Sequence, residues 1–471
     1  MTFVCTRQSS CPHVESLTAS IKKMEDLMAV ANKTIATLRE NVAILEQENL
    51  LLKKKGNERR KKRFKPNLPD KQSNKKGPPK GHIGHGRPAP TVIEKHVDIY
   101  PEKCNHCGNP NITVYEDHFK QHRIQDIQIQ VISTCYRKHS GYCPVCKKTI
   151  IPSETENVIP NSRIGTTARA IAGFLEHLGI PLKKRQSIFK DVFGLTLSHP
   201  SFINFEDIMA KRGFPLYQSL QDSVANSDNV HVDETGWRIN GRNCWLWTFV
   251  NNNAAFYRID STRGSDVVKD ILGESYDGIL SSDFYSAYNP IHAKGKQKCI
   301  PHLLVDIKNI QETSLIDTSC ADFVALQNLK TIFKQSIAIH TAFKNNLVTQ
   351  KDLISFKNLL IPELVNFVSF PSCNDDVLRI QHRIVKHNKE LLLFLDNPSV
   401  DPTNNLAERM LRPSVIIRKI SHGNRSEKGA LNHSIIMSIV QTAILNNKQP
   451  FSIFLSLASN SKDISDIIKP P

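Results

Sequence analysis

The sequence predicts a multidomain α+β protein, in which an N-terminal coiled coil and a cysteine-rich module precede a helical segment and an α/β domain. Three observations support this prediction. A heptad repeat occupies the start of the chain, two Cys-x-x-Cys pairs follow it, and strands that end in carboxylates appear among helical patterns in the second half. The 471 residues leave room for roughly two to four domains of ~100–200 residues each.

The chain is strongly basic, because 62 Lys and Arg face 45 Asp and Glu and leave a formal net charge of +17. Such a charge favours a polyanionic partner, either nucleic acid or an anionic membrane face. No apolar run reaches the ~18 residues that a transmembrane helix needs, and the start of the chain lacks the apolar core of a signal peptide. We therefore expect a soluble, intracellular protein that associates with nucleic acid.

Residues 14–55 carry a heptad repeat without Pro or Gly in its seam. An Asn at an a position, here Asn49, can fix the register and favour a two-stranded parallel coil. We predict a coiled coil that dimerises the chain, and the alternative is a single helix packed on its own domain. The a and d positions hold Leu17, Ile21, Met24, Met28, Ala31, Ile35, Leu38, Val42, Leu45, Asn49 and Leu52.

The next segment, residues 56–98, is basic and rich in Pro and Gly. From Lys53 to Lys80 there are 13 Lys and Arg against two acids, so +11 of the net charge falls here. Such a segment cannot bury a core and should be extended. It is either a solubilising linker or a DNA-binding arm whose affinity falls steeply with salt. Its most basic run is Arg59, Arg60, Lys61, Lys62 and Arg63.

The two Cys-x-x-Cys pairs define a module at residues 99–152. Two residues between thiolates let both sulfurs reach one tetrahedral zinc ion, and four thiolates leave no open position for catalysis. Because the ~35 residues between the pairs exceed the usual ~15–20, we expect a strand hairpin there, built from Ile112–Tyr115 and Ile127–Ser133. A redox dithiol is the alternative. The zinc-ribbon-like module would hold structural Zn²⁺ through Cys104, Cys107, Cys143 and Cys146, with Cys135, His106 and His139 as alternative ligands.

Residues 160–225 show helical periodicity. Helices are expected over Thr166–Leu178 and Leu182–Phe193, and a third begins near Ser198. This order of helix, tight turn and helix fits a helix-turn-helix-like (HTH-like) DNA-binding segment, but an ordinary helical subdomain fits it equally well.

Residues 226–450 begin with strands that end in carboxylates. The predicted succession is three strands, a helix and a fourth strand, which resembles the ribonuclease-H-like order of an α/β catalytic domain. In that order the first and fourth strands are neighbours, so Asp233 and Asp283 would come together. The elements are expected at Asn229–Thr235, Trp245–Val250, Ala254–Ile259, Gly264–Leu272 and Gly278–Asp283.

A later helix, capped by Asn404 or Asn405, would add the third carboxylate, Glu408. Arg409 and Arg412 would lie beside it to meet phosphate. Two Mg²⁺ ions ~3.5–4 Å apart need hard oxygen ligands of this kind. We therefore expect the three acids to bind two Mg²⁺ ions and to be catalytic. A single Asp at a strand end is usually a turn residue, and it is the order of strand, strand and helix that favours the site.

At these residues the chain resembles the transposases of the insertion sequence 66 family, which belong to the DDE group. The resemblance implies an enzyme that binds the terminal repeats of an insertion sequence in double-stranded DNA and catalyses metal-dependent strand cleavage and strand transfer. Its metal-binding acids would be Asp233, Asp283 and Glu408. It also implies a homodimer or higher oligomer, accessory transposition proteins, and a place at the nucleoid in a prokaryotic cytoplasm. The matching stretches are Gly81–Arg87, the knuckle at Cys104, Leu178–Pro181, Phe193–Ser198, Asp233–Trp237, Ser282–Tyr288 and Asn404–Pro413.

The family places a helical insertion between the second and third acids, which we expect at about residues 310–400, and a C-terminal tail would occupy residues 451–471. Related DDE enzymes carry a short Cys-x-x-His element after the second acid. Cys299 and His302 fit this element, and we expect them to be structural or active-site neighbours, not a zinc site on their own.

Two positions depart from the family pattern. Phe284 stands where the family usually has Gly, and Val305-Asp306-Ile307 stands where basic residues are usual. Both departures leave the acids intact. They keep an inactive transposase remnant among the alternatives, beside a non-catalytic zinc-containing DNA-binding regulator and a nuclease without joining activity.

Overall fold

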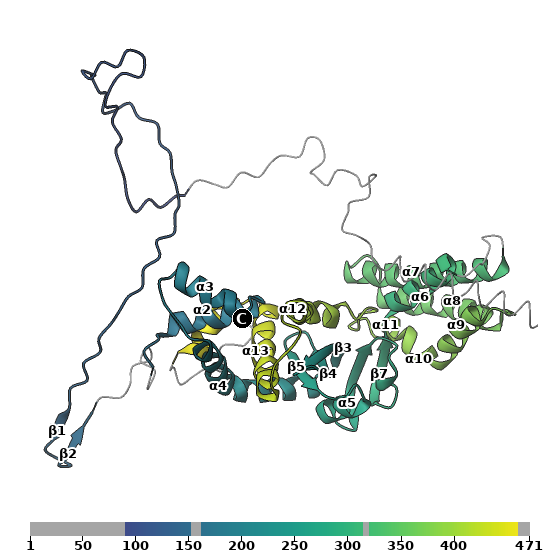
Figure 1. Cartoon of the computed structure of the whole chain (residues 1–471). Coiled ribbons are helices and arrows are strands. Elements are labelled where there is room, and N and C mark those ends of the chain that lie inside the picture. The colour runs from purple at the N-terminus through teal and green to yellow at the C-terminus, as the bar shows by residue number, and fades with distance from the viewer. Residues whose placement is uncertain (1–89, 152–161, 314–319, 460–471) are drawn as a thin grey trace, which may run out of the picture. The chain divides into compact units, whose positions relative to one another are not determined.

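The computed structural model describes residues 90–151, 162–313 and 320–459 (Figure 1). The coiled coil predicted at residues 14–55 and the basic run at 59–63 lie outside the described residues. The chain divides into two compact units, Met1–Asp126 and Ile127–Pro471. Within the described ranges, none of the helices combines the length and the apolar character that crossing a membrane requires.

The strands predicted between the two cysteine pairs are not formed. Residues 112–115 and 127–133 are described, and neither segment is a strand. The side chain of Ile127 is 83% exposed, so this segment has no buried face, and a strand pair without one is at best marginal. The structure instead shows a short antiparallel hairpin around the second cysteine pair, made of β1 (Gly141–Cys143) and β2 (Lys148–Ile150).

The three helices predicted after residue 160 are confirmed. They are α2 (Thr166–His177), α3 (Leu182–Asp191) and α4 (His199–Ala225). Two glycines follow α2 and α3 in the left-handed region, with φ of 79° at Gly179 and 67° at Gly194. Glycine adopts this conformation without steric cost, so it ends both helices sharply.

A mixed five-stranded sheet forms the centre of the second unit, in the order β5-β4-β3-β6-β7. The first three strands along the chain are antiparallel neighbours, whereas β6 runs parallel to β3 and β7 runs parallel to β6. All four predicted strands and the predicted helix are present, and β7 is additional. Their bounds are β3 (Asn229–Ile239), β4 (Arg242–Val250), β5 (Ala255–Asp260), α5 (Ser265–Leu272), β6 (Ser275–Ser282) and β7 (His292–Lys298).

The helical segment and the sheet share one hydrophobic core. Buried side chains of α4 such as Phe202 and Leu220 belong to the same cluster as Val232 and Trp247 of the sheet. Helix α13 (Glu427–Leu445) adds Ile439 to this cluster, and Figure 1 shows α2, α4 and α13 gathered at one end of the sheet. The predicted boundary near residue 225 therefore does not separate two cores.

The segment that we expected to be a tail contributes to this core. Residues Pro450–Ala458 form helix α14, with proline at its first turn, a position that proline favours. Its apolar residues recur at helical spacing, so Ile453, Phe454 and Leu457 are buried and pack against α2 and α4. The tail prediction is therefore wrong for α14, and residues 460–471 lie outside the described residues.

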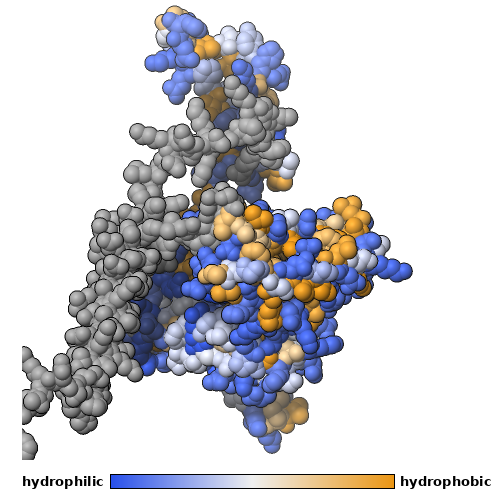
Figure 2. Space-filling model, turned by 90° about the vertical axis from the view of Figure 1, so that its right-hand side faces the viewer, coloured by the Kyte–Doolittle hydropathy of each residue, from blue (hydrophilic) through white to orange (hydrophobic). Residues whose placement is uncertain are grey.

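A helical insertion follows the sheet, as predicted. Its helices enclose a separate hydrophobic cluster that includes Phe333, Leu360 and Phe394. Figure 2 views the molecule from this side and shows apolar side chains gathered on its surface. The helices are α6 (Ile300–Thr313), α7 (Ala321–Lys344), α8 (Gln350–Ser369), α9 (Asp375–Lys386), α10 (Asn388–Leu391) and α11 (Leu393–Asp396).

If α14 and the sheet share one core, a substitution in α14 should destabilise the sheet. All three Trp residues lie in β3 and β4, so their fluorescence reports on the sheet. Phe454→Ala in α14 should lower the free energy of unfolding of the sheet by about 3–5 kcal/mol, because it removes a buried ring from the common core. Urea titration followed by Trp fluorescence measures this loss. The matched control is Ile203→Ala on the exposed side of α4, where Ile203 is 58% exposed, and its cost should stay within about 0.5 kcal/mol. An unchanged Trp transition in Phe454→Ala would contradict the common core.

Candidate active site

Two of the three predicted acids lie on neighbouring strands. In the parallel pair β3–β6, His231 lies opposite Ser281. Asp233 is two residues further along β3, and Asp283 follows the last residue of β6, so the two carboxylates reach the same edge of the sheet. Each accepts a backbone hydrogen bond nearby: Asp233 Oδ1 from the N–H of Glu234 at 3.0 Å and Asp283 Oδ1 from the N–H of Tyr285 at 2.8 Å.

The third acid, Glu408, lies in the first turn of α12 (Asn405–Ser421). Asn404 is the N-cap residue of this helix, as expected, but its side chain does not cap it. The Asn404 Nδ2 group instead donates to the carbonyl oxygen of Val232 on β3 at 2.8 Å. Its backbone N–H donates to Cys299 Sγ at 3.2 Å. The start of α12 is therefore fastened directly to the strand that carries Asp233.

Two of the predicted acids act electrostatically on the third, Asp233. Burial raises the pKa of Asp233 to about 8, and the negative charges of Glu234, Asp283 and Glu408 add to this rise. Like charges that share a partly buried site oppose each other's ionisation. Such an arrangement is typical of functional carboxylates and of sites that take up a cation. The charges of Asp283 and Glu408 therefore act on the Asp233 carboxyl, and the joint role of the three acids stays a prediction.

The triad is not a single tight cluster. Among the residues that the structure describes, one group of three or more His, Cys, Asp or Glu side chains has all its ligand atoms within 4.8 Å of one another, and it consists of Cys299, His302 and Glu408. Asp233 and Asp283 do not belong to that group. Separate ions of a two-metal site can be held by different carboxylates, so this spacing is compatible with such a site. Cys299 and His302 lie beside Glu408, and their role stays a prediction.

The sequence reasoning missed a buried carboxylate next to Asp233. Glu234 Oε1 accepts two hydrogen bonds from Arg263, from Nε at 3.0 Å and from Nη2 at 2.6 Å, and its Oε2 accepts one from the Tyr288 hydroxyl. The Arg263 guanidinium lies 3.9 Å from the centroid of the Tyr285 ring. Glu234 is thus paired with Arg263 and Tyr288. Glu234 and Tyr288 lie inside the matched stretches, whereas no sequence pattern marks Arg263.

A buried lysine supports Asp283, and it was also missed. Lys298, at the end of β7, is 0% exposed. Its Nζ donates to Ser282 Oγ at 3.1 Å and to the Asp283 carbonyl oxygen at 2.9 Å. Burial lowers the pKa of Lys298 to about 8. Lys298 therefore holds the backbone of Asp283 at the sheet edge. Its position directly before Cys299 is the signal that could have drawn attention to it.

The two departures from the family pattern are linked by one arginine. Arg383 on α9 lies with its guanidinium 4.9 Å from the centroid of the Phe284 ring. Its Nη1 also forms an ion pair with Asp306 Oδ2 at 2.6 Å. Phe284 and Asp306 thus share a partner in the helical insertion, so these two departures fit each other within this chain. Both neighbours of Glu408 that we expected to meet phosphate, Arg409 and Arg412, are exposed on α12.

The two predicted zinc knuckles belong to different compact units of the chain. In the first, the N–H of Gly108 donates to the carbonyl oxygen of Cys104 at 2.8 Å, and a hydrogen bond from the backbone of Cys107 lowers the pKa of Cys104. In the second, the backbone of Cys146 lowers the pKa of Cys143 in the same way. Backbone amides that support a thiolate are a feature of metal-binding knuckles. The ligand set itself stays a prediction.

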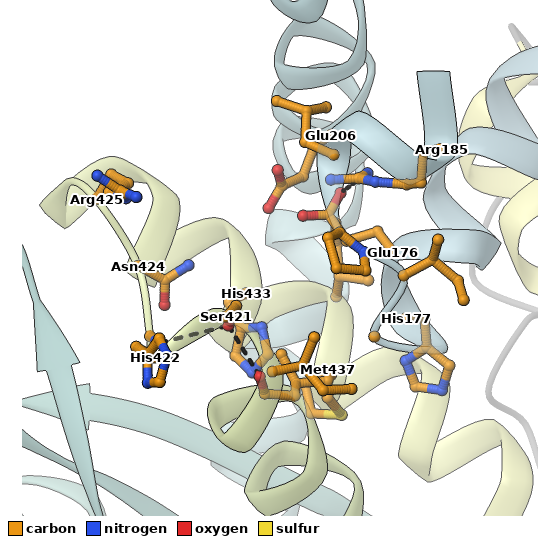
Figure 3. A pocket seen from close by; sticks show the side chains of 18 of the residues that line it. Glu176, His177, Arg185, Glu206, Ser421, His422, Asn424, Arg425, His433 and Met437 are labelled. Atoms are coloured by element: carbon orange, nitrogen blue, oxygen red, sulfur yellow. Dashed lines mark hydrogen bonds and ion pairs between the residues drawn. The ribbon is translucent and has the colours of Figure 1, made fainter. Parts of the chain in front are cut away.

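A cavity of about 550 Å³ lies apart from the acids, between the α2–α4 segment and the α12–α13 connection. Figure 3 shows an ion pair between Arg185 and Glu176 (2.7 Å) beside Glu206 on one wall. Burial lowers the pKa of both His177 and His433 to about 4, so both histidines are neutral at pH 7. None of the three predicted acids lines this cavity.

The raised pKa of Asp233 predicts a pH-dependent stability. The folded protein keeps a proton on Asp233 up to about pH 8, whereas the unfolded chain releases it near pH ~4. The stability that this proton binding contributes is complete below pH ~4 and is lost as the pH rises toward 8. In metal-free buffer, Asp233→Asn should therefore gain Tm relative to wild type between pH 5 and pH 9, by about 2–4 °C.

Thermal unfolding with a chelator at several pH values measures this difference. The matched control is Asp277→Asn, an exposed acid on β6, whose Tm difference from wild type should not change with pH. An Asp233→Asn difference that is equally flat would mean that burial and the neighbouring charges do not raise the pKa of Asp233.

Known proteins resemble this chain over much of its length. The chain matches the family described as "Transposase IS66 family" over residues 165–432, more than half of its length. It is also similar to two uncharacterized proteins of Sinorhizobium fredii (strain NBRC 101917 / NGR234). Protein y4qI is 24% identical over 416 residues, which cover 81% of this chain and 74% of that protein. Protein y4hP is 23% identical over 405 residues, which cover 77% of this chain and 72% of that protein. With all three acids inside the matched range, the chain belongs to the IS66 family of transposases.

Proposed function

We propose that this chain is a DNA transposase that binds the ends of an insertion sequence and catalyses metal-dependent strand cleavage and strand transfer. The observation that carries the proposal is the arrangement of the elements that hold the acids: parallel strands β3 and β6 bring Asp233 and Asp283 to one sheet edge, and Asn404 joins the start of α12, which carries Glu408, to β3. These acids come from β3, from the end of β6 and from α12, which are distant in the sequence. Membership of the family supports DNA as the partner.

The sheet topology supports a ribonuclease-H-like catalytic domain. Three antiparallel strands are followed by two parallel strands, with β3 in the centre. This order brings the first and fourth strands together and carries their acids to one edge, as the sequence pattern suggested. The helical insertion between the second and third acids leaves the sheet after β7 and returns to it at α12.

The donor set fits Mg²⁺. Carboxylate oxygens are the ligands that this hard cation takes, and the like charges that raise the pKa of Asp233 would be relieved by a cation. When bound, two Mg²⁺ ions would supply activation of the attacking water or 3′-hydroxyl and stabilisation of the leaving oxygen.

The surrounding residues have distinct supporting roles in this proposal. Asp233 and Asp283 present oxygens from the sheet edge, and Asn404 keeps Glu408 beside them through its bond to β3. Lys298 fixes the backbone of Asp283. The pairing of Glu234 with Arg263 leaves Asp233 as the more available carboxylate. Arg409 and Arg412, exposed on the same helix as Glu408, are placed to meet DNA phosphates.

The remaining modules would bind and arrange the DNA. The basic arm, with Arg59, Arg60, Lys61, Lys62 and Arg63, would contact phosphates in a salt-dependent manner. The zinc module and the helical segment would help to hold the element ends. The coiled coil at residues 14–55 would join two chains, so that two ends are held together.

Substitution of the second acid tests the catalytic proposal. Asp283→Asn keeps the size of the side chain but removes its charge, and strand cleavage of element-end DNA in Mg²⁺ should fall by at least ~100-fold, because several kcal/mol of transition-state stabilisation are lost. Glu408→Gln should behave alike. Asp277→Asn, on the same strand but exposed, is the matched control and should keep wild-type activity.

The reaction products separate the alternatives. Cleavage without joined products would indicate a nuclease, and end binding without cleavage in any metal would indicate a non-catalytic regulator or an inactive remnant. Strand transfer that persists at the wild-type level in Asp283→Asn would refute the assignment of the acids.

The zinc module makes a separate prediction. The purified chain should retain one tightly bound zinc ion at this module, because four thiolates form a closed structural site. The double variant Cys104→Ser, Cys143→Ser should lose it, as measured by atomic emission, whereas Cys373→Ser, an exposed cysteine elsewhere in the chain, should retain it. Full zinc content in the double variant would exclude these ligands.

A further inference from the structure

A group of three side chains that could bind a metal ion includes one of the proposed catalytic acids. A thiol, an imidazole and a carboxylate, from Cys299, His302 and Glu408, have ligand atoms that all lie within 4.8 Å of one another. Cys299 and His302 alone would be too few ligands for zinc, since protein sites supply at least three. Glu408, which comes from another helix, makes the third.

Backbone hydrogen bonds hold these ligands in place. Cys299 joins β7 to α6, and its N–H donates to the Ser282 carbonyl oxygen at 2.9 Å. The N–H of the next residue, Ile300, donates to the Pro402 carbonyl oxygen at 3.0 Å. The N–H of Asn404 donates to Cys299 Sγ at 3.2 Å. The start of α6 and the start of α12 are thus linked through the main chain, so the site is built on fixed elements.

One of the three ligand side chains is buried, and the other two are partly exposed to solvent. Cys299 is 1% exposed, whereas the side chains of His302 and Glu408 are 46% and 36% exposed. His302 Nδ1 lies 3.8 Å from Glu408 Oε1, which is too long for a hydrogen bond. Two ligands of one tetrahedral zinc ion lie about 3.5 Å apart, so a small side-chain rotation suffices to place an ion between them. The exposed side leaves a position for water.

The chemistry of this set differs from that of the acid triad. Thiolate and imidazole ligands favour Zn²⁺ and related ions, whereas Mg²⁺ takes oxygen ligands. Glu408 belongs to both sets. An ion held by Cys299 and His302 would engage the carboxylate that the triad needs for Mg²⁺.

We propose that Cys299, His302 and Glu408 form a Zn²⁺ site, and that Zn²⁺ bound there withdraws Glu408 from the catalytic acids and switches strand cleavage off. On binding, the Cys299 thiol releases its proton to solvent and its sulfur forms a bond to the ion. The binding site stands on its ligands alone. The switch rests on the function proposed above, because it presumes that Glu408 is catalytic.

Cobalt(II) is the probe for the binding site, since a thiolate bound to Co²⁺ gives a charge-transfer absorption. The full chain, already loaded with zinc at its N-terminal module, is titrated with Co²⁺. Wild type should take up one thiolate-bound equivalent, Cys299→Ala should lose it, and His302→Ala should bind it roughly tenfold more weakly. The matched control Cys244→Ala removes another buried cysteine, on β4, and should bind Co²⁺ as wild type does.

Identical cobalt spectra in wild type and Cys299→Ala would overturn the site. If Cys299→Ala fails to fold, His302→Ala decides, because His302 is half-exposed, and unchanged Co²⁺ affinity in this variant would likewise overturn the site.

Zinc inhibition tests the switch. At fixed Mg²⁺, added Zn²⁺ should lower strand cleavage by wild type about tenfold, the usual size of a coupling between two ligand sites. The result for each protein is the ratio of its rates with and without Zn²⁺. The ratio for His302→Ala should return close to one. Equal inhibition of both proteins would overturn the switch. No cleavage at any Mg²⁺ concentration, with the cobalt difference intact, would overturn the switch and the proposed function while the Zn²⁺ site stands.

Discussion

The candidate site depends on one buried amide. Asn404 is 1% exposed, and it joins α12 to β3 through Val232 and to the β7–α6 junction through Cys299. The acids repel one another, so no attraction among them can hold Glu408 near Asp233. The Asn404 contacts hold the start of α12, and Met410 and Leu411 pack on the sheet further along the helix. A residue that left the buried groups around Asn404 unpaired would cost about 1–3 kcal/mol and loosen the first turn of α12, where Glu408 lies.

Side chains of the helical insertion contact the edge of the sheet where Asp283 lies. Arg383 on α9 contacts Phe284, the residue directly after Asp283, and it also binds Asp306 on α6. Lys298 holds Asp283 from the strand that leads into α6. Lys298 of β7 thus holds Asp283, and Arg383 of the insertion contacts Phe284. These contacts explain how this chain accommodates a bulky ring at a position where the family usually has glycine.

Local patterns were sufficient to predict much of the fold. Short apolar runs that end in carboxylates predicted β3 and β6, and their order predicted that Asp233 and Asp283 would meet. Contacts between distant segments were not predictable. Nothing in the sequence around Arg263 shows that it binds Glu234, because that pair forms only after the strands assemble. The tail prediction failed for a similar reason: α14 is short, and its burial depends on the groove that α2 and α4 provide. The strands expected between the cysteine pairs failed because they have no buried face.

The basic arm and the candidate active site carry charge of opposite sign. A net charge of +11 lies between Lys53 and Lys80, out of +17 for the chain, so bulk attraction to phosphate belongs to the arm. The candidate active site instead concentrates negative charge, which DNA would repel unless cations intervene. Under the proposed function, its chemistry would be set by which cation the carboxylates hold. Because Glu408 lies within 4.8 Å of the Cys299 and His302 ligand atoms and also belongs to the proposed acid triad, the choice between Mg²⁺ and a softer ion would fall on this single side chain.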